Sequence, residues 1–271
     1  MNRQTDKGTA LITGASSGIG ATYADRLARR GYDLILVARN RERLDALATR
    51  LEAQTSSMVE TVTADLEDAS DLRGIENLLQ TDSSICMLVN NAGMGLYAPT
   101  LQSSLDTMQR MISLNVTALM RLSHAAARGF ADRGDGTIVN IASIVALAPE
   151  VINAVYGGTK AFVLAFSQSL RHELRDSGVR VQVVLPGATA TEFWSHAGKP
   201  VSELPAHLVM TVQDMVDAAL AGFDQGEFVT IPALPDLADW QALEAARLAL
   251  QPNLSRAQPA ARYLAARPAA A

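Results

Sequence analysis

A tyrosine and a lysine one helical turn apart form the part of this chain best suited to chemistry. They are Tyr156 and Lys160, in the run Tyr-Gly-Gly-Thr-Lys, and Ser143 lies thirteen residues upstream. The unperturbed pKa of tyrosine is about 10, so a phenol is a poor acid near neutrality. A lysine at i+4 lies on the same helix face, and its charge is expected to lower the pKa of the phenol. The three groups could act together on one carbonyl group.

The surrounding sequence indicates how these side chains are positioned. Ser143 follows the apolar run Thr137–Ala142, which predicts a buried strand that delivers the hydroxyl to a sheet edge. A tyrosine with a lysine at i+4 also occurs by chance, so the motif needs support from elsewhere in the chain. Gly157 and Gly158 each cost about 1 kcal/mol in a helix relative to alanine, and they permit either close packing or a wider site.

A glycine-rich turn near the amino end gives that support. Thr9–Thr13 predicts a short buried strand, and Gly14-Ala15-Ser16-Ser17-Gly18-Ile19-Gly20 joins it to a helical stretch over residues 21–30. Glycines let a pyrophosphate approach the backbone amides at a helix N-terminus. The spacing differs from the commoner dinucleotide fingerprint. The alternative is a glycine-rich turn that binds nothing. The place of the turn between a strand and a helix argues against that alternative.

Six separated motifs resemble those of the short-chain dehydrogenase/reductase family. They are Gly14-x-x-x-Gly18-x-Gly20, Asn90-Asn91-Ala92-Gly93, Asn115, Ser143, Tyr156-x-x-x-Lys160 and Pro186-Gly187, in the family's order and spacing from about Gly8 to Ile231. The resemblance implies a single Rossmann-type oxidoreductase domain that uses a nicotinamide cofactor.

The resemblance also implies a role for each site residue. Tyr156 would be the general acid in carbonyl reduction and the base in alcohol oxidation, and Ser143 would hydrogen-bond the substrate oxygen. Lys160 would bind the nicotinamide ribose. Asn115 would hold a water that links the lysine to solvent, although it could instead mark a helix kink. The residues implied to bind the cofactor are Gly14, Ser16, Ser17, Gly18, Ile19, Gly20, Asp65, Leu66, Asn91, Ala92, Gly93, Tyr156, Lys160, Pro186, Gly187 and Thr191.

The end of the second predicted strand indicates which nicotinamide cofactor is used. An acidic residue there would pair with the ribose hydroxyls of NAD, whereas this chain has Ala38-Arg39-Asn40-Arg41. The Arg39 guanidinium could bind a 2′-phosphate through two hydrogen bonds and stack on adenine. A solvated charge run is the alternative, since residues 41–43 resemble an exposed helix face. We therefore expect NADP(H) in preference to NAD(H).

Short apolar runs alternate with helical patterns, which predicts an α/β fold with a parallel sheet covered on both faces. The expected strands are Thr9–Thr13, Asp33–Ala38, Met58–Thr63, Ile85–Val89, Thr137–Ala142, Val179–Leu185 and Phe228–Ile231. The expected helices after the first are Arg41–Gln54, Ala69–Gln80, Leu105–Ala131, Val155–Ser177 and Asp214–Asp224. The long pattern 105–131 is expected to be two helices meeting near Leu114 and Asn115. The family resemblance implies a doubly wound seven-stranded sheet in the order 3-2-1-4-5-6-7.

The expected domain organisation is one catalytic domain over residues 1–251, with a substrate lid at about residues 188–210. Residues 252–271 are expected to form a C-terminal tail, either frayed or folded as a partial helix against a neighbour. By resemblance, a homodimer or homotetramer would assemble through the helices at about 115–131 and 155–177.

Composition excludes several other classes of protein. Of the 271 residues, 48% are hydrophobic and 19% are charged, which is typical of a globular enzyme. A net charge of −5 argues against a nucleic-acid surface. The single cysteine, Cys86, excludes an internal disulfide, and no residue cluster has metal-ligand spacing. No signal peptide or membrane span is apparent, so a cytoplasmic protein without membrane partners is expected.

The substrate is less well specified by the sequence. The expected walls of its pocket are Met94–Tyr97, Ile144–Val151 and Ala188–Met210, which are mainly apolar. They favour a hydrophobic ketone, aldehyde or secondary alcohol, unless the same residues only pack the lid onto the body. His196 and His207 are expected to be surface or packing residues. Two alternatives to such an enzyme are a nucleotide-sugar epimerase or dehydratase and a non-catalytic dinucleotide sensor on the same fold.

Overall fold

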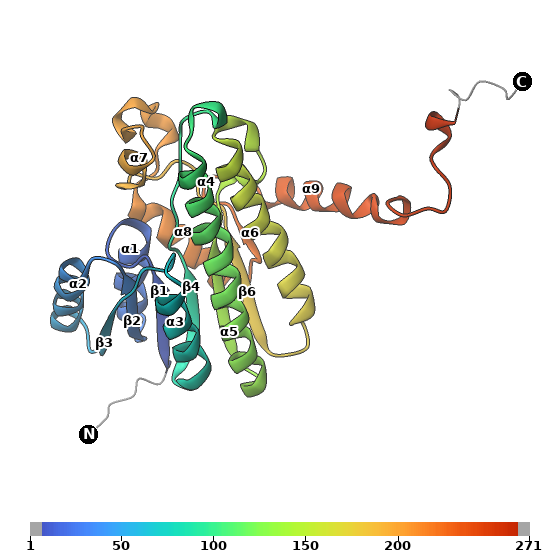
Figure 1. Ribbon diagram of the computed structural model, residues 1–271. Helices are drawn as coiled ribbons and strands as arrows, with labels where there is room; N and C mark the ends of the chain where they lie inside the picture. Colours follow the sequence, from blue (N-terminus) through green and yellow to red (C-terminus); the bar gives the residue numbers. More distant parts are fainter. Residues whose placement is uncertain (1–6, 265–271) are drawn as a thin grey trace, which may run out of the picture. The chain divides into compact units, whose positions relative to one another are not determined.

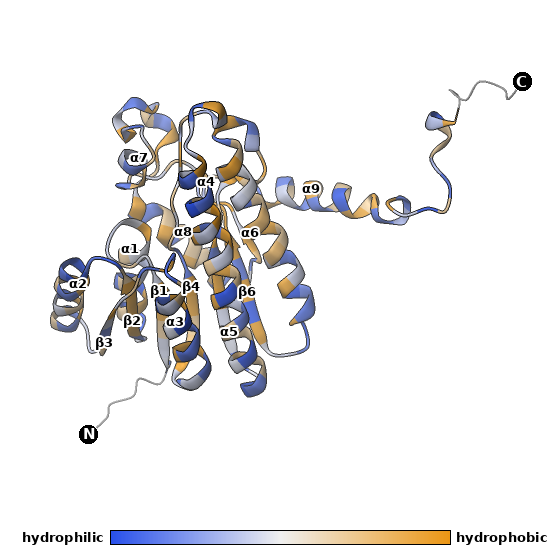
Figure 2. Cartoon of the chain, viewed as in Figure 1, coloured by the Kyte–Doolittle hydropathy of each residue, from blue (hydrophilic) through white to orange (hydrophobic). Residues whose placement is uncertain are grey.

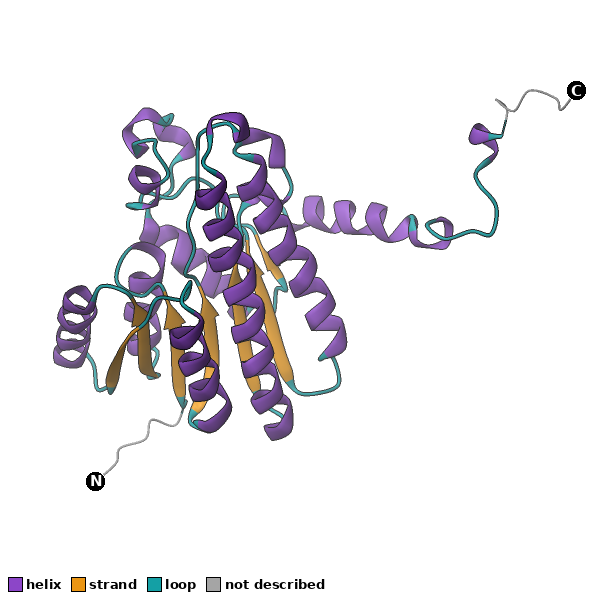
Figure 3. Ribbon diagram, viewed as in Figure 1, coloured by secondary structure: helices purple, strands orange, loops and turns teal. Residues whose placement is uncertain are grey.

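The computed structural model describes residues 7–264, which fall into two compact units that divide between Pro232 and Ala233. The first unit holds a sheet of seven parallel strands, and helices pack on both faces of this sheet (Figures 1 and 3). The strands are β1 Thr9–Thr13, β2 Asp33–Ala38, β3 Val59–Thr63, β4 Ile85–Asn90, β5 Gly136–Ile141, β6 Val179–Val184 and β7 Val229–Thr230. Their order, β3-β2-β1-β4-β5-β6-β7, confirms the predicted topology and the α/β fold class.

The helices follow the predicted pattern closely. They are α1 Gly18–Arg29, α2 Arg41–Gln54, α3 Ala69–Thr81, α4 Leu105–Ile112, α5 Leu119–Arg133, α6 Ala154–Glu173, α7 Phe193–His196, α8 Val212–Asp224 and α9 Leu237–Ala249. Side-chain caps begin several of them: Asn40 for α2, Asp68 for α3, Asn153 for α6 and Thr211 for α8. The predicted break in the long helical pattern is a π-helical turn, Ser113–Ala118, between α4 and α5.

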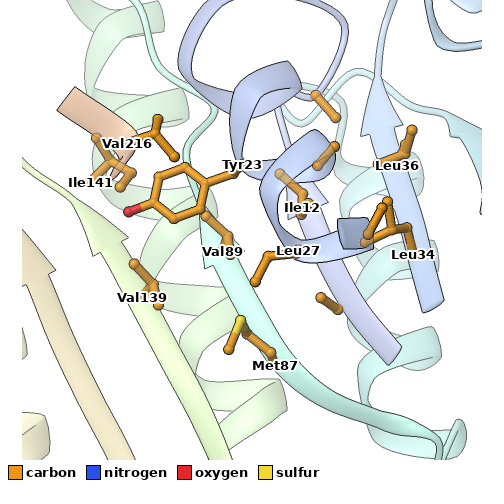
Figure 4. Packing of buried hydrophobic residues seen from close by; sticks show 14 of the residues in the cluster. Ile12, Tyr23, Leu27, Leu34, Leu36, Met87, Val89, Val139, Ile141 and Val216 are labelled. Carbon is orange, nitrogen blue, oxygen red and sulfur yellow. The ribbon is translucent and has the colours of Figure 1, made fainter. Parts of the chain in front are cut away.

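Alternate residues of each strand enter two separate apolar cores. Ala10 and Ile12 of β1 face the core under α1 and α8, whereas Leu11 faces the core under α3, α5 and α6. Figure 4 shows the first core, in which Tyr23 of α1 lies beside Val89 of β4, Ile141 of β5 and Val216 of α8. The helices are apolar toward the sheet and polar outward, as the banding of α5 in Figure 2 shows. Two covered faces explain why the strands are nearly all apolar.

The second unit contains α9 and two short 3₁₀ turns, Gln251–Asn253 and Ala261–Tyr263. The sequence patterns above did not predict α9, in which no residue is buried. The predicted boundary after residue 251 and the character of the tail stay predictions, and residues 265–271 of that tail lie outside the described chain.

Parallel strands place their carboxyl ends along one edge of the sheet, and the site is built there. The arrowheads in Figure 3 point toward the end of the first unit where α7 lies. Segment 188–210 is closed at its base by a bridge between Thr189 and Met210. We call residues 188–210 the lid segment.

Candidate active site

The turn between β1 and α1 has a shape that only glycines allow. Gly14 and Gly18 have φ angles of 65° and 53°, which favour glycine over other residues. A Cβ at Gly14 would lie 2.8 Å from the Asn91 side-chain nitrogen, and one at Gly20 would lie 2.6 Å from the same atom. That nitrogen donates hydrogen bonds to the carbonyls of Thr13 and Gly14. The predicted glycine turn and the Asn91 motif are therefore packed against each other.

A cavity of about 970 Å³ runs from this turn along the carboxyl edge of the sheet. It has the size of a ligand site and passes the N-terminus of α1, where backbone amides favour an anion. Its lining includes all of the predicted cofactor residues except Gly20: Gly14, Ser16, Ser17, Gly18, Ile19, Arg39, Asp65, Leu66, Asn91, Ala92, Gly93, Tyr156, Lys160, Pro186, Gly187 and Thr191. Gly20 lies beneath the turn instead. The donors and the room present fit a dinucleotide.

Three of the four predicted catalytic residues line the same cavity: Ser143, Tyr156 and Lys160. Ser143 follows β5 and caps a 3₁₀ turn by accepting a hydrogen bond from the Val145 amide. Asn153 caps α6 by accepting from the Val155 and Tyr156 amides, which places the tyrosine in the first helical turn. The two caps fix the backbone on either side of the reacting groups.

The expected lowering of the Tyr156 pKa is wrong for this structure. Burial raises the pKa of Tyr156 to about 12, and a hydrogen bond with Ser143 opposes the rise. Burial also lowers the pKa of Lys160 to about 8. The lysine Nζ lies 5.8 Å from the centre of the tyrosine ring and donates to the Ile141 carbonyl at 2.9 Å. The spacing along the helix correctly predicts that the two side chains lie close together. Their burial away from water, however, has the largest effect on both pKa values.

Asn115 lies in the π-helical turn and does not line the cavity. Its side-chain oxygen accepts from the Met94 amide, and its nitrogen donates to the Met94 carbonyl and to the Thr159 hydroxyl. The Thr159 hydroxyl in turn donates to the Tyr156 carbonyl. The Asn115 side chain thus joins the segment after β4 to α6, which carries the tyrosine.

Charged side chains line the end of the cavity beyond β2. Arg39 is more than half exposed, and its guanidinium lies 3.8 Å from Asp65 and 3.7 Å from Glu67. Glu67 is bound more closely by Arg110, at 2.9 Å. Arg39 is therefore loosely paired and could exchange its carboxylate partners for a phosphate.

Sequence reasoning missed two charged residues at this end. Arg43, which resembled part of an exposed helix face, lines the cavity and forms a two-point ion pair with Glu192 at 2.6 and 3.2 Å. Glu192 follows Thr191 and leads into α7. The two residues are 149 positions apart, and no spacing or motif in the sequence links them.

The apolar half of the cavity matches the predicted walls in part. Its lining includes Met94, Gly95 and Tyr97, then Ile144, Val145 and Val151, and then Phe193, Trp194, His196, Leu204 and Leu208. Met210 packs on the core under α1, and His207 does not line the cavity. The lid residues thus both contact the body and bound the cavity, so the two readings of the sequence are compatible.

The structure explains one of the two glycines after Tyr156. A Cβ at Gly157 would lie 3.1 to 3.2 Å from Pro149 atoms, so this glycine permits close packing of α6. A Cβ at Gly158 would meet nothing within 4 Å. Neither glycine widens the cavity, whose lining does not include them.

Residues 7–264 have neither a metal-binding cluster nor a membrane-spanning helix. No group of three or more histidine, cysteine, aspartate or glutamate side chains there could hold a metal ion. No helix in the same part of the chain has the length and apolar character needed to cross a membrane.

Comparison with known proteins identifies the family. The family model for short chain dehydrogenase matches residues 8–201. A short-chain dehydrogenase from Sphingobium yanoikuyae, solved in complex with NADPH, is 52% identical, covers 94% of this chain and all of its own, and superposes with a TM-score of 0.91. The bulky-bulky ketone specific alcohol dehydrogenase from Comamonas testosteroni is 47% identical, with a TM-score of 0.87 over 95% of this chain and 98% of its own.

A relative named for a different activity is similar over a shorter stretch. Serine 3-dehydrogenase from Rhizobium radiobacter is 37% identical over 187 residues, which are 69% of this chain and 74% of that protein. The family match over most of the chain agrees with the sheet order, the glycine turn and the clustered tyrosine and lysine. The chain belongs to the short-chain dehydrogenase/reductase family of oxidoreductases.

Proposed function

We propose that this protein is an NADP(H)-dependent oxidoreductase that interconverts a bulky, hydrophobic ketone or aldehyde and its alcohol. The observation that carries the proposal is one cavity that joins the glycine turn, the Ser143–Tyr156–Lys160 group and an apolar wall. A bound nicotinamide would supply the hydride for carbonyl reduction or accept it from the alcohol. The specificity of the Comamonas testosteroni relative for bulky-bulky ketones supports a substrate with two large groups.

In this proposal, the residues around the carbonyl oxygen handle its proton and its charge. Tyr156 donates its phenol proton to the substrate oxygen during reduction and takes it back during oxidation. Ser143 donates a hydrogen bond to the same oxygen, where negative charge develops. Lys160 holds the ribose of the cofactor, with its ammonium 5.8 Å from the centre of the Tyr156 ring. Asn115 keeps α6 in register with the segment after β4, through Met94 and Thr159.

We propose a preference for NADPH because of the charge at the far end of the cavity. Arg39 is loosely paired, and Arg43 lines the same end, so two guanidinium groups could meet a 2′-phosphate. The solved complex of the Sphingobium yanoikuyae relative with NADPH supports this choice. Asp65 remains a candidate for contact with the adenine.

The alternatives have less support from the site. The spacing Gly14-x-x-x-Gly18-x-Gly20 of the glycine turn argues against a nucleotide-sugar epimerase. A non-catalytic sensor would not need the buried ammonium of Lys160, because burial of a charge destabilises the fold. An oxidoreductase explains the buried ammonium.

We also propose a cytoplasmic homodimer or homotetramer that pairs through α5 and α6. Met120 of α5 is an exposed apolar residue, and Phe162 and Phe166 of α6 stack with ring centres 5.6 Å apart at partly exposed positions. Such residues suit a self-complementary interface. Sedimentation at micromolar concentration tests the assembly, and a monomer would contradict it.

A ketone panel tests the proposed reaction directly. NADPH oxidation is followed by absorbance with aromatic and aliphatic ketones of increasing size and with a small ketose as a control, and NADP⁺ reduction is followed with serine as a second control. The expected result is turnover of bulky apolar ketones and none of the controls. Tyr156→Phe should lose activity by at least about a hundredfold while binding of NADPH stays nearly intact, because only the proton is lost. Activity within tenfold of wild type would contradict the assignment.

A further inference from the structure

The ring of Phe193 occupies the space where a side chain at position 95 would begin. A Cβ built on Gly95 would overlap Cζ of Phe193 and lie 2.7 Å from Cε2 and 3.1 Å from Cε1. Carbon atoms in contact are normally about 3.5 to 4.0 Å apart. Phe193 can therefore keep its position only because residue 95 has no side chain.

Two other aromatic rings contact Phe193. The Tyr156 ring lies with its centre 5.7 Å away at an angle of 46°, and Trp194 meets Phe193 edge to face at 5.7 Å. Trp194 is itself held by a hydrogen bond from its indole nitrogen to the Thr189 carbonyl at 3.0 Å. The Phe193 ring thus lies directly between the loop after β4 and the predicted catalytic tyrosine.

The lid segment that carries Phe193 is anchored at both ends of α7. The Tyr97 amide donates to the Ala197 carbonyl at 2.9 Å, and the Lys199 ammonium donates to the Tyr97 hydroxyl at 2.8 Å. On the other side, Arg43 holds Glu192. Since these contacts resist movement of α7 as a whole, crowding at position 95 would be relieved by the Phe193 side chain alone. The remaining open side of that ring is the cavity, which both Gly95 and Phe193 line.

We propose that Gly95 determines the size of the accepted ketone by giving the Phe193 ring a place outside the substrate's volume. The inference rests on the proposed ketone reductase function and adds its specificity-determining pair. Gly95 acts as a positioning residue, because its effect passes through Phe193 rather than through contact with the substrate. A methyl group at position 95 would turn the ring toward Tyr156 and the cavity, and ketones with two large substituents would lose their space first.

A double-mutant cycle tests the proposal in the full-length protein. Wild type, G95A, F193A and G95A/F193A are each assayed with NADPH and two probes, acetophenone and a diaryl or long-chain aryl ketone. The measured quantity is the ratio of kcat/KM for the bulkier ketone to that for acetophenone. One misplaced methyl-sized group in an apolar pocket changes such discrimination by about tenfold to a hundredfold, so G95A should lower the ratio by that amount. In the F193A background, the added G95A change should alter the ratio by less than about twofold.

Thermal unfolding gives a second readout that needs no substrate. G95A should lower the Tm of the wild-type protein, because the ring must leave its packed position, and should lower it much less in the F193A background. Equal effects of G95A in both backgrounds, on the ratio or on Tm, would overturn the proposed contact. If all four proteins reduce ketones and the ratio is unchanged in G95A, only the proposed role of Gly95 in substrate size is refuted. If none reduces a ketone, both the proposed function and the proposed role of Gly95 are refuted.

Discussion

Replacement of Lys160 by methionine tests the ionisation of the site without a substrate. Lys160 is 7% exposed, and burial lowers its pKa from 10.5 to about 8. At about 1.4 kcal/mol for each pH unit, the difference between the two values corresponds to about 3 kcal/mol of lost folding free energy at neutral pH. Methionine has a similar length and no charge, so Lys160→Met removes that cost.

The variant also loses one favourable interaction. The Lys160 ammonium donates a hydrogen bond to the Ile141 carbonyl, and an unsatisfied buried carbonyl costs about 1–3 kcal/mol. At pH 7 the free energy of unfolding of Lys160→Met is therefore expected to equal that of wild type or exceed it by up to about 2 kcal/mol.

The dependence on pH separates the two contributions. Below about pH 8 both the folded and the unfolded wild type hold the proton on Lys160, and the cost of burying the charge is fully present. Between about pH 8 and 10.5 the unfolded chain keeps a proton that the folded chain has released, so the stability of wild type rises with pH. The difference in unfolding free energy between the variant and wild type should therefore move by about 2–3 kcal/mol in favour of wild type between pH 7 and pH 10.

Urea unfolding followed by far-ultraviolet circular dichroism measures this difference at pH 7, 8, 9 and 10, at one protein concentration. The raised pKa of Tyr156 is common to both proteins and cancels in the comparison. Lys7→Met, at an exposed lysine, controls for the loss of one positive charge. A difference between Lys160→Met and wild type that stays constant over this pH range would refute the buried-charge reasoning.

Four further substitutions test the packing and charge of the site. Gly158→Ala should raise the unfolding free energy by about 0.8–1 kcal/mol, because the added methyl group meets nothing. Gly157→Ala should raise the unfolding free energy less or lower it, because its Cβ meets Pro149. A higher Tm for Gly157→Ala than for Gly158→Ala would contradict this. Arg39→Ala should weaken NADPH by about one to two decades and NADH much less, and equal losses in fluorescence titrations would make Arg39 a surface charge only. Glu192→Gln should change the unfolding free energy by less than about 1 kcal/mol, since its ion pair with Arg43 is exposed. The same change should strengthen NADPH binding at low salt, because it frees the Arg43 guanidinium, and an unchanged affinity for NADPH would contradict this.

The fold could be predicted because the residue pattern of each strand and helix agrees with the place of that element in the sheet. Leu11 lies between Ala10 and Ile12 in β1, and all three are apolar because both faces of the sheet are covered. The glycine turn was recognisable because its positive φ angles and close approach to Asn91 exclude other residues. Local conformation and local motif therefore carried the prediction of the cofactor loop.

The parts that sequence reasoning missed depend on distance in space or on removal from water. The i,i+4 spacing of Tyr156 and Lys160 places them together, but it does not report how deeply both are buried. The Arg43–Glu192 ion pair forms only once β2 and the lid segment have been brought to the same edge of the sheet. Neither result follows from residue type and spacing alone.

The π-helical turn Ser113–Ala118 has a consequence for how this protein can change in evolution. Such a turn contains one residue more than a turn of regular α-helix. In an α-helix, each residue turns the chain by about 100° around the helix axis. Deleting one residue there would restore regular α-helix and keep α5 on the sheet, because the wide turn holds its extra residue without rotating the helices that it joins. Asn115 would lose the place from which it accepts a hydrogen bond from the Met94 amide, whereas Leu122 and Ala126 of α5 would stay packed on the sheet. A deletion within residues 113–118 should therefore cost the link between the segment after β4 and α6 rather than the packing of α5.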